Sequence, residues 1–378
     1  MLHKNIIIHY EAKGIYIMKP TKTFLIITTI LFATTNSNAC TGITLKSRDN
    51  AIIVARTMDW SGEEMDNMYV VVPRGHTSQS SLPNEEDGGM LFTAKYGYVG
   101  LAVVAPEYII DGTNEAGLSA ALFYFPKYGK YQDYNPQYKA NTLADFQLVP
   151  WILAQFDNID DVKAAVQNIR VVNFDPRAET VHWRITDKNG KQVILEIVNG
   201  VPNFYDSELG VITNAPGYQW HLTNLNNYIN LIPGAVEPHD IHGVTLRPLG
   251  AGSGFLGMPG DFTPPSRFVR AAFFETYSLQ QNTASDTIRQ AFHILNNFDV
   301  PLGVQFNVDK APNNMPSATQ WTIATDLTNM QIYYHTMYNR NIRHIDMRAI
   351  DFETVPYQYG MLDGIKEQPI TTIEIIPE

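Results

Sequence analysis

Short apolar blocks separated by polar turns mark both ends of the chain, and this pattern is typical of β-strands. Residues 40–45 and 51–55 form the first two blocks, and the polar run 47–50 between them predicts a hairpin. Antiparallel pairing is the simplest arrangement for the later blocks, because short turns such as 111–117 and 187–190 separate them. The later predicted strands lie at residues 69–72, 98–105, 118–125, 182–186, 192–198, 211–214, 321–326, 331–336 and 371–376.

Helical periodicity appears in the middle of the chain and again before its last strands. Asn141 and Thr142 can cap a helix with one apolar face, and Pro150 is expected to kink or restart that helix. Further helices are predicted for about residues 160–169 and 286–295. The apolar face of the first helix comprises Phe146, Val149, Ile152, Leu153 and Phe156.

A fourth predicted helix carries a cation in an unusual place. Ser266, which follows Pro264 and Pro265, can cap a helix that has Arg267 in its first turn. The N-terminus of a helix already carries partial positive charge, so an arginine there is unfavourable unless it has another role. Two interpretations remain: Arg267 acts in a site, or its side chain points away into solvent.

Residues 18–39 have the parts of a secretory signal peptide. Lys19 and Lys22 supply positive charge, residues 24–33 are apolar but too short to span a bilayer comfortably, and residues 37–39 read Ser-Asn-Ala. We therefore expect residues 1–39 to be removed, with Met18 as the true start. The mature chain, residues 40–378, is expected to form one domain and to be exported, either to a periplasm or as a secreted protein.

Cleavage after Ala39 would make Cys40, the only cysteine, the first residue of the mature chain. Such a residue carries a thiol and a free α-amine, and an amine with a pKa of about 7.7–8.0 can take the thiol's proton near neutral pH. Two other interpretations are an inert buried cysteine and an acylated lipoprotein cysteine. A lipoprotein signal usually has leucine three residues before the cysteine, where this chain has Ser37.

Composition limits the partners of the protein. The 378-residue chain has a net charge of −11, and the expected leader holds four lysines and one glutamate, so the mature chain is more acidic still. This acidity argues against nucleic acid, and against a membrane after processing, as a partner. A single cysteine excludes an intramolecular disulfide, so stability must come from a hydrophobic core, which the 44% hydrophobic content allows.

Neither a metal nor a cofactor is expected. His239 and His242 lack a third ligand, so we interpret them as structural or exposed. The glycine-rich run 250–257 contains the spacing of a dinucleotide-binding motif, but Met-Pro-Gly-Asp follows it instead of a helix.

Three polar residues are candidates to act with Cys40. If residues 40–45 pair with the block that follows, Arg56 and Asp59 lie near the new N-terminus; the alternative is a solvated ion pair of little energetic value. Asn214 stands before Ala-Pro, where it either donates its carboxamide into a site or only forms a turn.

Taken in order along the chain, these motifs resemble the choloylglycine hydrolase family, which includes penicillin V acylases and conjugated bile salt hydrolases. The resemblance implies an α+β fold of N-terminal-nucleophile hydrolase type, a four-layer α/β/β/α sandwich of two stacked antiparallel sheets flanked by helices. It also implies amide hydrolysis through a thioester acyl-enzyme, no cofactor, and a homo-oligomer, specifically a tetramer. The matching segments are Cys40, residues 56–59, 111–117, 214–216, 258–262 and 266–270.

The resemblance assigns roles to single residues. Cys40 matches the nucleophile, Arg56 the arginine beside its sulfur, and Asp59 the carboxylate that holds the α-amine. Asn214 matches the oxyanion donor, a role typically worth about 2.7–4 kcal/mol, and Arg267 matches the second arginine of the site.

Two positions bear on the substrate. Tyr124 precedes Phe-Pro where bile salt hydrolases of the family carry asparagine, and Trp60 after Asp59 is similar to the exported Gram-negative branch. We predict that Tyr124 and Trp60 line the pocket for the acyl group of a small acyl amide, such as penicillin V or an N-acyl homoserine lactone. Bile salt hydrolysis is the alternative within the family. An exported lipoprotein binding module and an acyltransferase are alternatives of other classes.

Overall fold

The computed structural model describes residues 39–60, 62–83, 88–174, 179–306 and 310–376. The expected leader up to residue 38 lies outside the described residues, so its removal stays a prediction. Among the residues that are described, no helix is long and apolar enough to cross a membrane.

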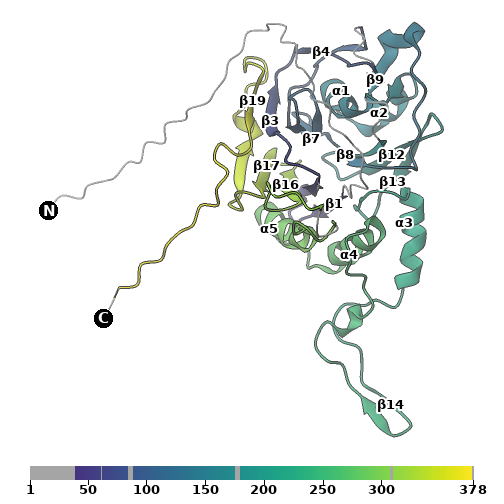
Figure 1. Cartoon of the computed structure of the whole chain (residues 1–378), viewed down its shortest axis with the longest axis vertical. Coiled ribbons are helices and arrows are strands. Elements are labelled where there is room, and N and C mark those ends of the chain that lie inside the picture. The colour runs from purple at the N-terminus through teal and green to yellow at the C-terminus, as the bar shows by residue number, and fades with distance from the viewer. Residues whose placement is uncertain (1–38, 61, 84–87, 175–178, 307–309, 377–378) are drawn as a thin grey trace, which may run out of the picture.

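A five-stranded antiparallel sheet, here sheet A, carries the N-terminal hairpin (Figure 1). The predicted hairpin is confirmed, with Cys40 opposite Met58 and Ala39 opposite Asp59. Its turn closes on Asn50, whose φ of 69° is a left-handed conformation that asparagine tolerates. In spatial order the strands are β1 (Ala39–Lys46), β2 (Ile52–Asp59), β16 (Thr319–Asp326), β17 (Gln331–Thr336) and β18 (Arg343–Asp346).

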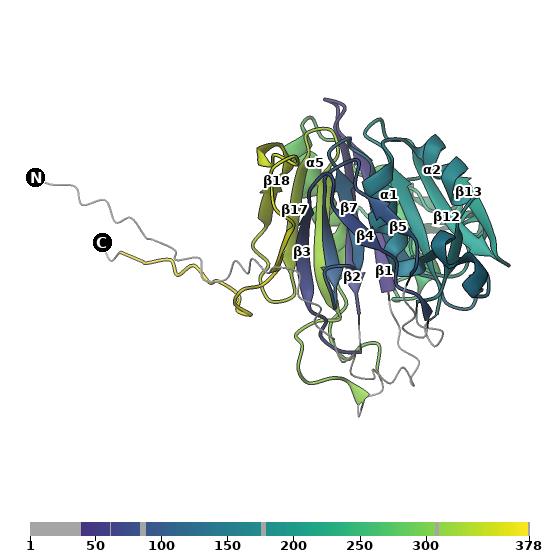
Figure 2. The ribbon, with the colours of Figure 1, turned by 90° about the horizontal axis from the view of Figure 1, so that it is seen from above.

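An eight-stranded sheet, here sheet B, stacks on sheet A (Figure 2). All of its neighbouring strands are antiparallel, as predicted. In spatial order they are β13 (Val201–Asp206), β12 (Gln192–Val198), β11 (Val181–Thr186), β8 (Ser119–Tyr124), β7 (Ile109–Asn114), β6 (Tyr98–Val103), β3 (Asn67–Val72) and β19 (Gln358–Met361).

Helices cover the outer face of each sheet, which gives the predicted α/β/β/α order of layers (Figures 1 and 2). α1 (Leu148–Gln155) and α2 (Ile159–Val166) share a core with sheet B, whereas α4 (Pro264–Tyr277) and α5 (Ala284–Leu295) pack on sheet A. α3 (Tyr218–Leu225) lies beside α4. Because both faces of each sheet are covered, β2 is buried at every position. Polar residues on β2 therefore lie inside the protein.

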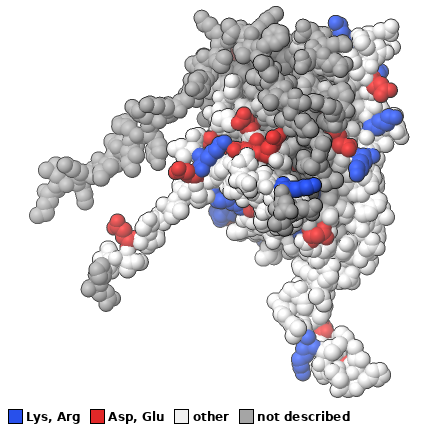
Figure 3. Space-filling model, in the orientation of Figure 1, with Lys and Arg blue, Asp and Glu red and all other residues white. Residues whose placement is uncertain are grey.

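Short strand pairs complete the fold. They are β4 (Thr77–Gln79) with β5 (Leu91–Thr93), β9 (Thr142–Ala144) with β10 (Arg170–Val172), and β14 (His239–Ile241) with β15 (Val244–Leu246). The last pair lies in an arm, residues 235–252, that stands out from the body of the molecule (Figures 1 and 3). Most of the visible surface of the arm is uncharged in Figure 3.

Two of the predicted helix starts are wrong. The helix predicted from Asn141 begins only at Leu148, because residues 142–144 pair as a strand and residues 145–147 form a 3-10 turn. Pro150 then lies in the first turn of α1, where its missing N–H has no carbonyl to bond. In α4 the cap position belongs to Thr263, and Ser266 lies inside the first turn.

Three strand predictions also need correction. Residues 111–114 belong to β7, so the predicted turn is shortened to residues 115–117. Residues 211–214 form no strand, although Ile212 makes an isolated antiparallel bridge to Gly42. Residues 371–376 have strand-forming side chains but are exposed and pair with no strand among the described residues, and a strand exists only where a neighbouring strand accepts its hydrogen bonds.

Candidate active site

The register of the β1–β2 hairpin brings Arg56 to the sulfur of Cys40. Cys40 is opposite Met58 and Gly42 is opposite Arg56, so Arg56 lies diagonally across from Cys40 on the same face. Its Nη2 donates to Cys40 Sγ over 2.9 Å. Gly42, opposite Arg56, has no room for a side chain, because a Cβ there would lie only 2.8 Å from the Ile212 side chain and 3.1 Å from Arg184 Nη1.

The guanidinium of Arg56 is fully buried. Its Nη1 donates to the carbonyl of Leu122 over 2.6 Å. The guanidinium also lies over the ring of Phe123, with 4.2 Å between its Cζ and the ring centre. A fixed positive charge beside sulfur favours a thiolate over a thiol. The arrangement can therefore support a nucleophilic cysteine.

Arg267 connects helix α4 to the start of β1. It lies in the first turn, as predicted, and its side chain is fully buried rather than pointing into solvent. Its Nη1 donates to the carbonyl oxygen of Cys40, and its Nη2 to Asn214 Oδ1 over 2.6 Å. Its Nη1 also reaches Thr41 Oγ1 over 2.9 Å, and its Nε reaches the Phe262 carbonyl over 2.9 Å. These bonds give the cation partners that the helix terminus does not provide.

Asn214 contacts Cys40 directly, although 174 positions separate the two residues. The backbone nitrogen of Cys40 donates to Asn214 Oδ1 over 2.9 Å, while Asn214 Nδ2 donates to the carbonyl of Tyr124 over 2.8 Å. An NH₂ group has two hydrogens, so one remains for another acceptor. The role of Asn214 as oxyanion donor stays a prediction.

Asp59 lies at the end of β2, opposite Ala39, next to the expected cleavage point. Its carboxylate accepts from Thr319 Oγ1 over 2.6 Å and from Thr57 Oγ1 over 3.2 Å. Burial raises the pKa of Asp59 to about 7, and the nearby charge of Arg267 opposes this rise. Asp59 thus lies opposite the residue whose removal would free the Cys40 nitrogen, and that nitrogen bonds Asn214 in the chain that includes Ala39.

The two predicted pocket residues differ in their placement. Tyr124 is half-buried at the end of β8, and its carbonyl bonds Asn214, so its backbone belongs to the site. Trp60 is half-buried directly after β2 and packs against the large core cluster that includes Met58 and Tyr98. That both rings line one acyl pocket stays a prediction.

Sequence reasoning missed several polar residues of the site. Thr57 accepts from the nitrogen of Thr41 over 3.2 Å and donates to Asp59, and Thr319 holds the other carboxylate oxygen. The sequence contained a signal for Thr57, because it lies between the candidates Arg56 and Asp59 on one predicted strand. Thr319 had no local signal, since only the pairing of β16 with β2 brings it to Asp59.

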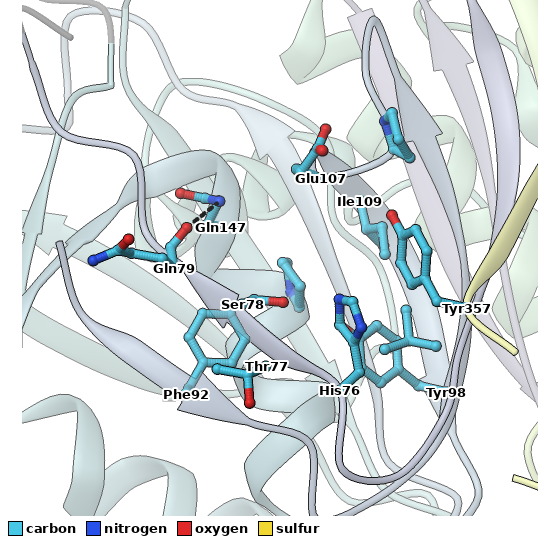
Figure 4. Close-up of a pocket in the computed structure, with 13 residues that line it drawn as sticks. His76, Thr77, Ser78, Gln79, Phe92, Tyr98, Glu107, Ile109, Gln147 and Tyr357 are labelled. Carbon is cyan, nitrogen blue, oxygen red and sulfur yellow. Dashed lines mark hydrogen bonds between the residues drawn. The ribbon is translucent and has the colours of Figure 1, made fainter. Parts of the chain in front are cut away.

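Figure 4 shows a cavity of about 250 Å³ that neither Cys40 nor any other predicted site residue lines. Its walls include His76, Phe92, Tyr98 and Tyr357. The chemistry at Cys40 is therefore not in this cavity. Within the described residues, no group of three or more His, Cys, Asp or Glu side chains is placed to hold a metal ion.

Comparison with known proteins is consistent with this geometry. The bile salt hydrolase/transferase of Clostridium perfringens is 32% identical over 331 residues, which cover 85% of this chain and 97% of that protein. The penicillin V acylase of Pectobacterium atrosepticum is 25% identical over 326 residues, 79% of this chain and 78% of that protein. A crystal structure of a mutant conjugated bile acid hydrolase from Clostridium perfringens superimposes with a TM-score of 0.76 and 28% identity, covering 89% of this chain and 100% of that one.

The family model described as linear amide C–N hydrolases, choloylglycine hydrolase family, matches residues 40–358. This match starts at Cys40 and covers most of the chain, including all seven predicted site residues. The chain therefore belongs to the choloylglycine hydrolase family and is a hydrolase of linear amides.

Proposed function

We propose that the protein hydrolyses an N-acyl amide with Cys40 as its nucleophile, after residues 1–39 have been removed. The contact of 2.9 Å between Arg56 Nη2 and Cys40 Sγ is the observation that carries this proposal. It places a buried positive charge at the one sulfur in the sequence that can act as a thiolate nucleophile. Cys40 also lies at the first position of the family match.

The reaction proceeds in two steps. The free α-amine of Cys40 takes the thiol's proton, and the thiolate attacks the amide carbonyl to give a tetrahedral oxyanion. Collapse of this intermediate transfers the proton to the leaving amine and leaves a thioester on Cys40. Water then attacks the thioester and releases the acid. Asn214 is proposed to donate its second amide hydrogen to the oxyanion in both steps.

Asp59 is proposed to act on the amine rather than on the sulfur. Removal of Ala39 would leave a positively charged or neutral amine in front of a buried carboxylate. The carboxylate would orient the amine and favour its protonated form while the thiolate attacks. The buried charge of Asp59 would gain a compensating partner at the same time.

For the substrate, we propose an amide with an aromatic or fatty acyl group, such as penicillin V or an N-acyl homoserine lactone. Tyr124 and Trp60 support this choice, because aromatic rings favour flat or flexible apolar groups. Bile salts are the second candidate, because a relative named bile salt hydrolase/transferase is 32% identical to this chain. If Trp60 lines the pocket, Trp60→Ala should raise KM more than it lowers kcat.

A parallel assay of penicillin V, N-acyl homoserine lactones and glycocholate decides between these substrates. We expect one of the first two to have the highest kcat/KM, and a higher value for glycocholate would refute the assignment of the pocket. The mass of the mature N-terminus tests the nucleophile: a free Cys40 supports it, whereas a diacylglyceryl adduct would support a lipoprotein. Steady release of free amine in water separates hydrolysis from acyl transfer.

We also propose that the mature protein is exported and forms a homo-oligomer, specifically a tetramer. The arm supports assembly, because it exposes apolar side chains that gain nothing from facing water. Light scattering after chromatography would measure the mass, and replacing residues 236–251 by a short glycine-serine linker should lower it. The exposed apolar residues of the arm are Val236, Ile241, Val244, Leu246 and Leu249.

A further inference from the structure

Asp111 and Arg184 form a buried charge pair on sheet B, next to the backbone of Ile110 that Arg56 contacts. Arg184 Nη2 lies 3.8 Å from Asp111 Oδ2, and both side chains are almost fully buried. Ala121 of β8 pairs with Asp111 on one side and with Arg184 on the other, so the two charged residues share one row of sheet B. The charge pair therefore sits between the two sheets, with no access to solvent.

Arg56 and Arg184 each donate to backbone carbonyls of the opposite sheet. Arg56, on sheet A, bonds sheet B, and Arg184, on sheet B, bonds sheet A. The ring of Phe123 lies close to both guanidiniums, at 4.2 Å from that of Arg56 and 5.8 Å from that of Arg184. The carbonyl acceptors are Leu122 and Ile110 for Arg56, at 2.6 and 3.4 Å, and Ala55 and Ile43 for Arg184, at 3.2 and 3.4 Å.

Asp111, Arg184 and Arg56 interact mainly by electrostatics rather than by hydrogen bonds to one another. Asp111 Oδ2 and Arg184 Nη2 have no hydrogen-bond partner among the described residues. Burial raises the pKa of Asp111, and the charges of Arg184 and Arg56 lower it in part. Burial lowers the pKa of Arg184 to about 10, which the charge of Asp111 opposes. A change in one of these charges is therefore felt by the other two.

The charged side chains around Cys40 belong to strands of both sheets and to helix α4. Arg56 of β2 contacts the sulfur, Arg267 of α4 contacts the carbonyl, and Asp59 lies at the end of β2 beside residue 39. Asp111 of β7 directly follows Ile110, whose carbonyl accepts from Arg56, and Arg184 of β11 lies 3.8 Å from Asp111. Of these five, only Asp111 and Arg184 make no direct contact with Cys40 or its neighbouring residues at the expected cleavage site.

We propose that Asp111 and Arg184 are positioning residues that act on Cys40 through their charge: together with Arg56, they set the net positive charge that the thiolate of Cys40 experiences. The proposal rests on the role of Cys40 given above. The alternative is an ion pair that only joins the two sheets. The two ideas predict different effects. If the pair is only structural, neutralising either member lowers stability and leaves the reactivity of the thiol unchanged. If the pair sets the charge, neutralising Asp111 and neutralising Arg184 change the reactivity of the thiol in opposite directions.

The test is alkylation of the mature protein by iodoacetamide between pH 5 and 10, followed by intact mass. Cys40 is the only cysteine, so one adduct reports one thiol. Asp111→Asn removes a negative charge and should move the pH of half-maximal alkylation rate downward by on the order of one unit. Arg184→Gln removes a positive charge and should move it upward by about as much. This measurement needs no substrate, so it is independent of which amide the enzyme cleaves.

Glu115→Gln and Arg74→Gln are the matched controls. Glu115 belongs to the same sequence motif as Asp111, but its ion pair with Arg74, at 2.6 Å, is partly exposed, and neither control should move the alkylation midpoint. Equal shifts of both test variants in one direction, or no shift in either, would overturn the proposal. If Arg184→Gln does not fold, Arg184→Lys replaces it: an unchanged midpoint supports the proposal, and a downward shift contradicts it.

Discussion

Replacing Arg267 by methionine tests whether this arginine holds the site together. The side chain is fully buried and bonds four oxygens, those of Phe262, Cys40, Thr41 and Asn214. Methionine fills much of the space but donates no hydrogen bond. Removing one member of a buried charged network typically costs about 3–5 kcal/mol. A domain of about 340 residues loses roughly 0.7 kcal/mol of stability per degree near its Tm, so we expect Tm to fall by about 4–7 °C.

The loss of stability in Arg267→Met should depend on pH, because Arg267 lowers the pKa of Asp59. In the chain that retains Ala39, that pKa is about 7, above the ordinary 3.8. Ionised Asp59 therefore costs folding free energy, and this cost is absent below pH 3.8 and complete above pH 7. Without Arg267 the pKa of Asp59 should rise further and the cost should grow. The fall in Tm should accordingly be larger at pH 8 than at pH 5.

Thermal denaturation of the full-length chain at both pH values, read by circular dichroism, makes the measurement. Arg267→Lys is the matched variant, because it keeps the charge but not the planar guanidinium. We expect it to retain the pH dependence of the wild type and to lose part of the stability. A Tm of Arg267→Met within 1 °C of the wild type at both pH values would refute the reasoning.

Three further predictions concern the hairpin. Cys40→Ala should fold and show no amidase activity, and Cys40→Ser should be strongly impaired because an α-amine is too weak a base for a hydroxyl; near-normal turnover by Cys40→Ala contradicts the mechanism. Protein that keeps Ala39, verified by mass, should be inactive because its Cys40 nitrogen is an amide, and full activity would require another base. Gly42→Ala should cost about 1–3 kcal/mol, because its Cβ would meet Ile212 and Phe123 at 2.8 and 2.9 Å, whereas Gly252→Ala, with open space around it, should melt like the wild type.

The hairpin could be predicted from sequence because its signals are local. Two apolar runs and a polar turn define β1 and β2, and the register then places Arg56 and Asp59 near Cys40. Asn214 and Arg267 are different, since 174 and 227 positions separate them from Cys40. Local reasoning left both with an ordinary alternative, a turn former and an exposed cation. Only the order of motifs along the whole chain, read as a family resemblance, assigned them to the site.

Two of the wrong predictions share a physical cause. The predictions for residues 142–144 and 371–376 rest on side chains, but a strand is completed by the backbone groups of a neighbour. Residues 142–144 find that neighbour in residues 170–172 and become a strand instead of a helix. Residues 371–376 find none in the part of the chain that the structure describes, and they stay exposed. Side-chain propensity thus names what a segment can form, and pairing across the fold decides what it does form.

Contacts between residues distant in sequence also explain why the arginines near Cys40 are buried. An arginine inside a strand or at a helix N-terminus is unfavourable by itself, so sequence gives Arg56, Arg184 and Arg267 no reason to be buried. Each becomes tolerable because carbonyls of another layer accept its hydrogen bonds. The carbonyls satisfy the donors but carry no full charge, so the interior keeps an excess of positive charge next to Cys40. A thiolate at Cys40 would reduce that excess, so the burial of these arginines beside the only cysteine supports the proposed role of Cys40 as the nucleophile.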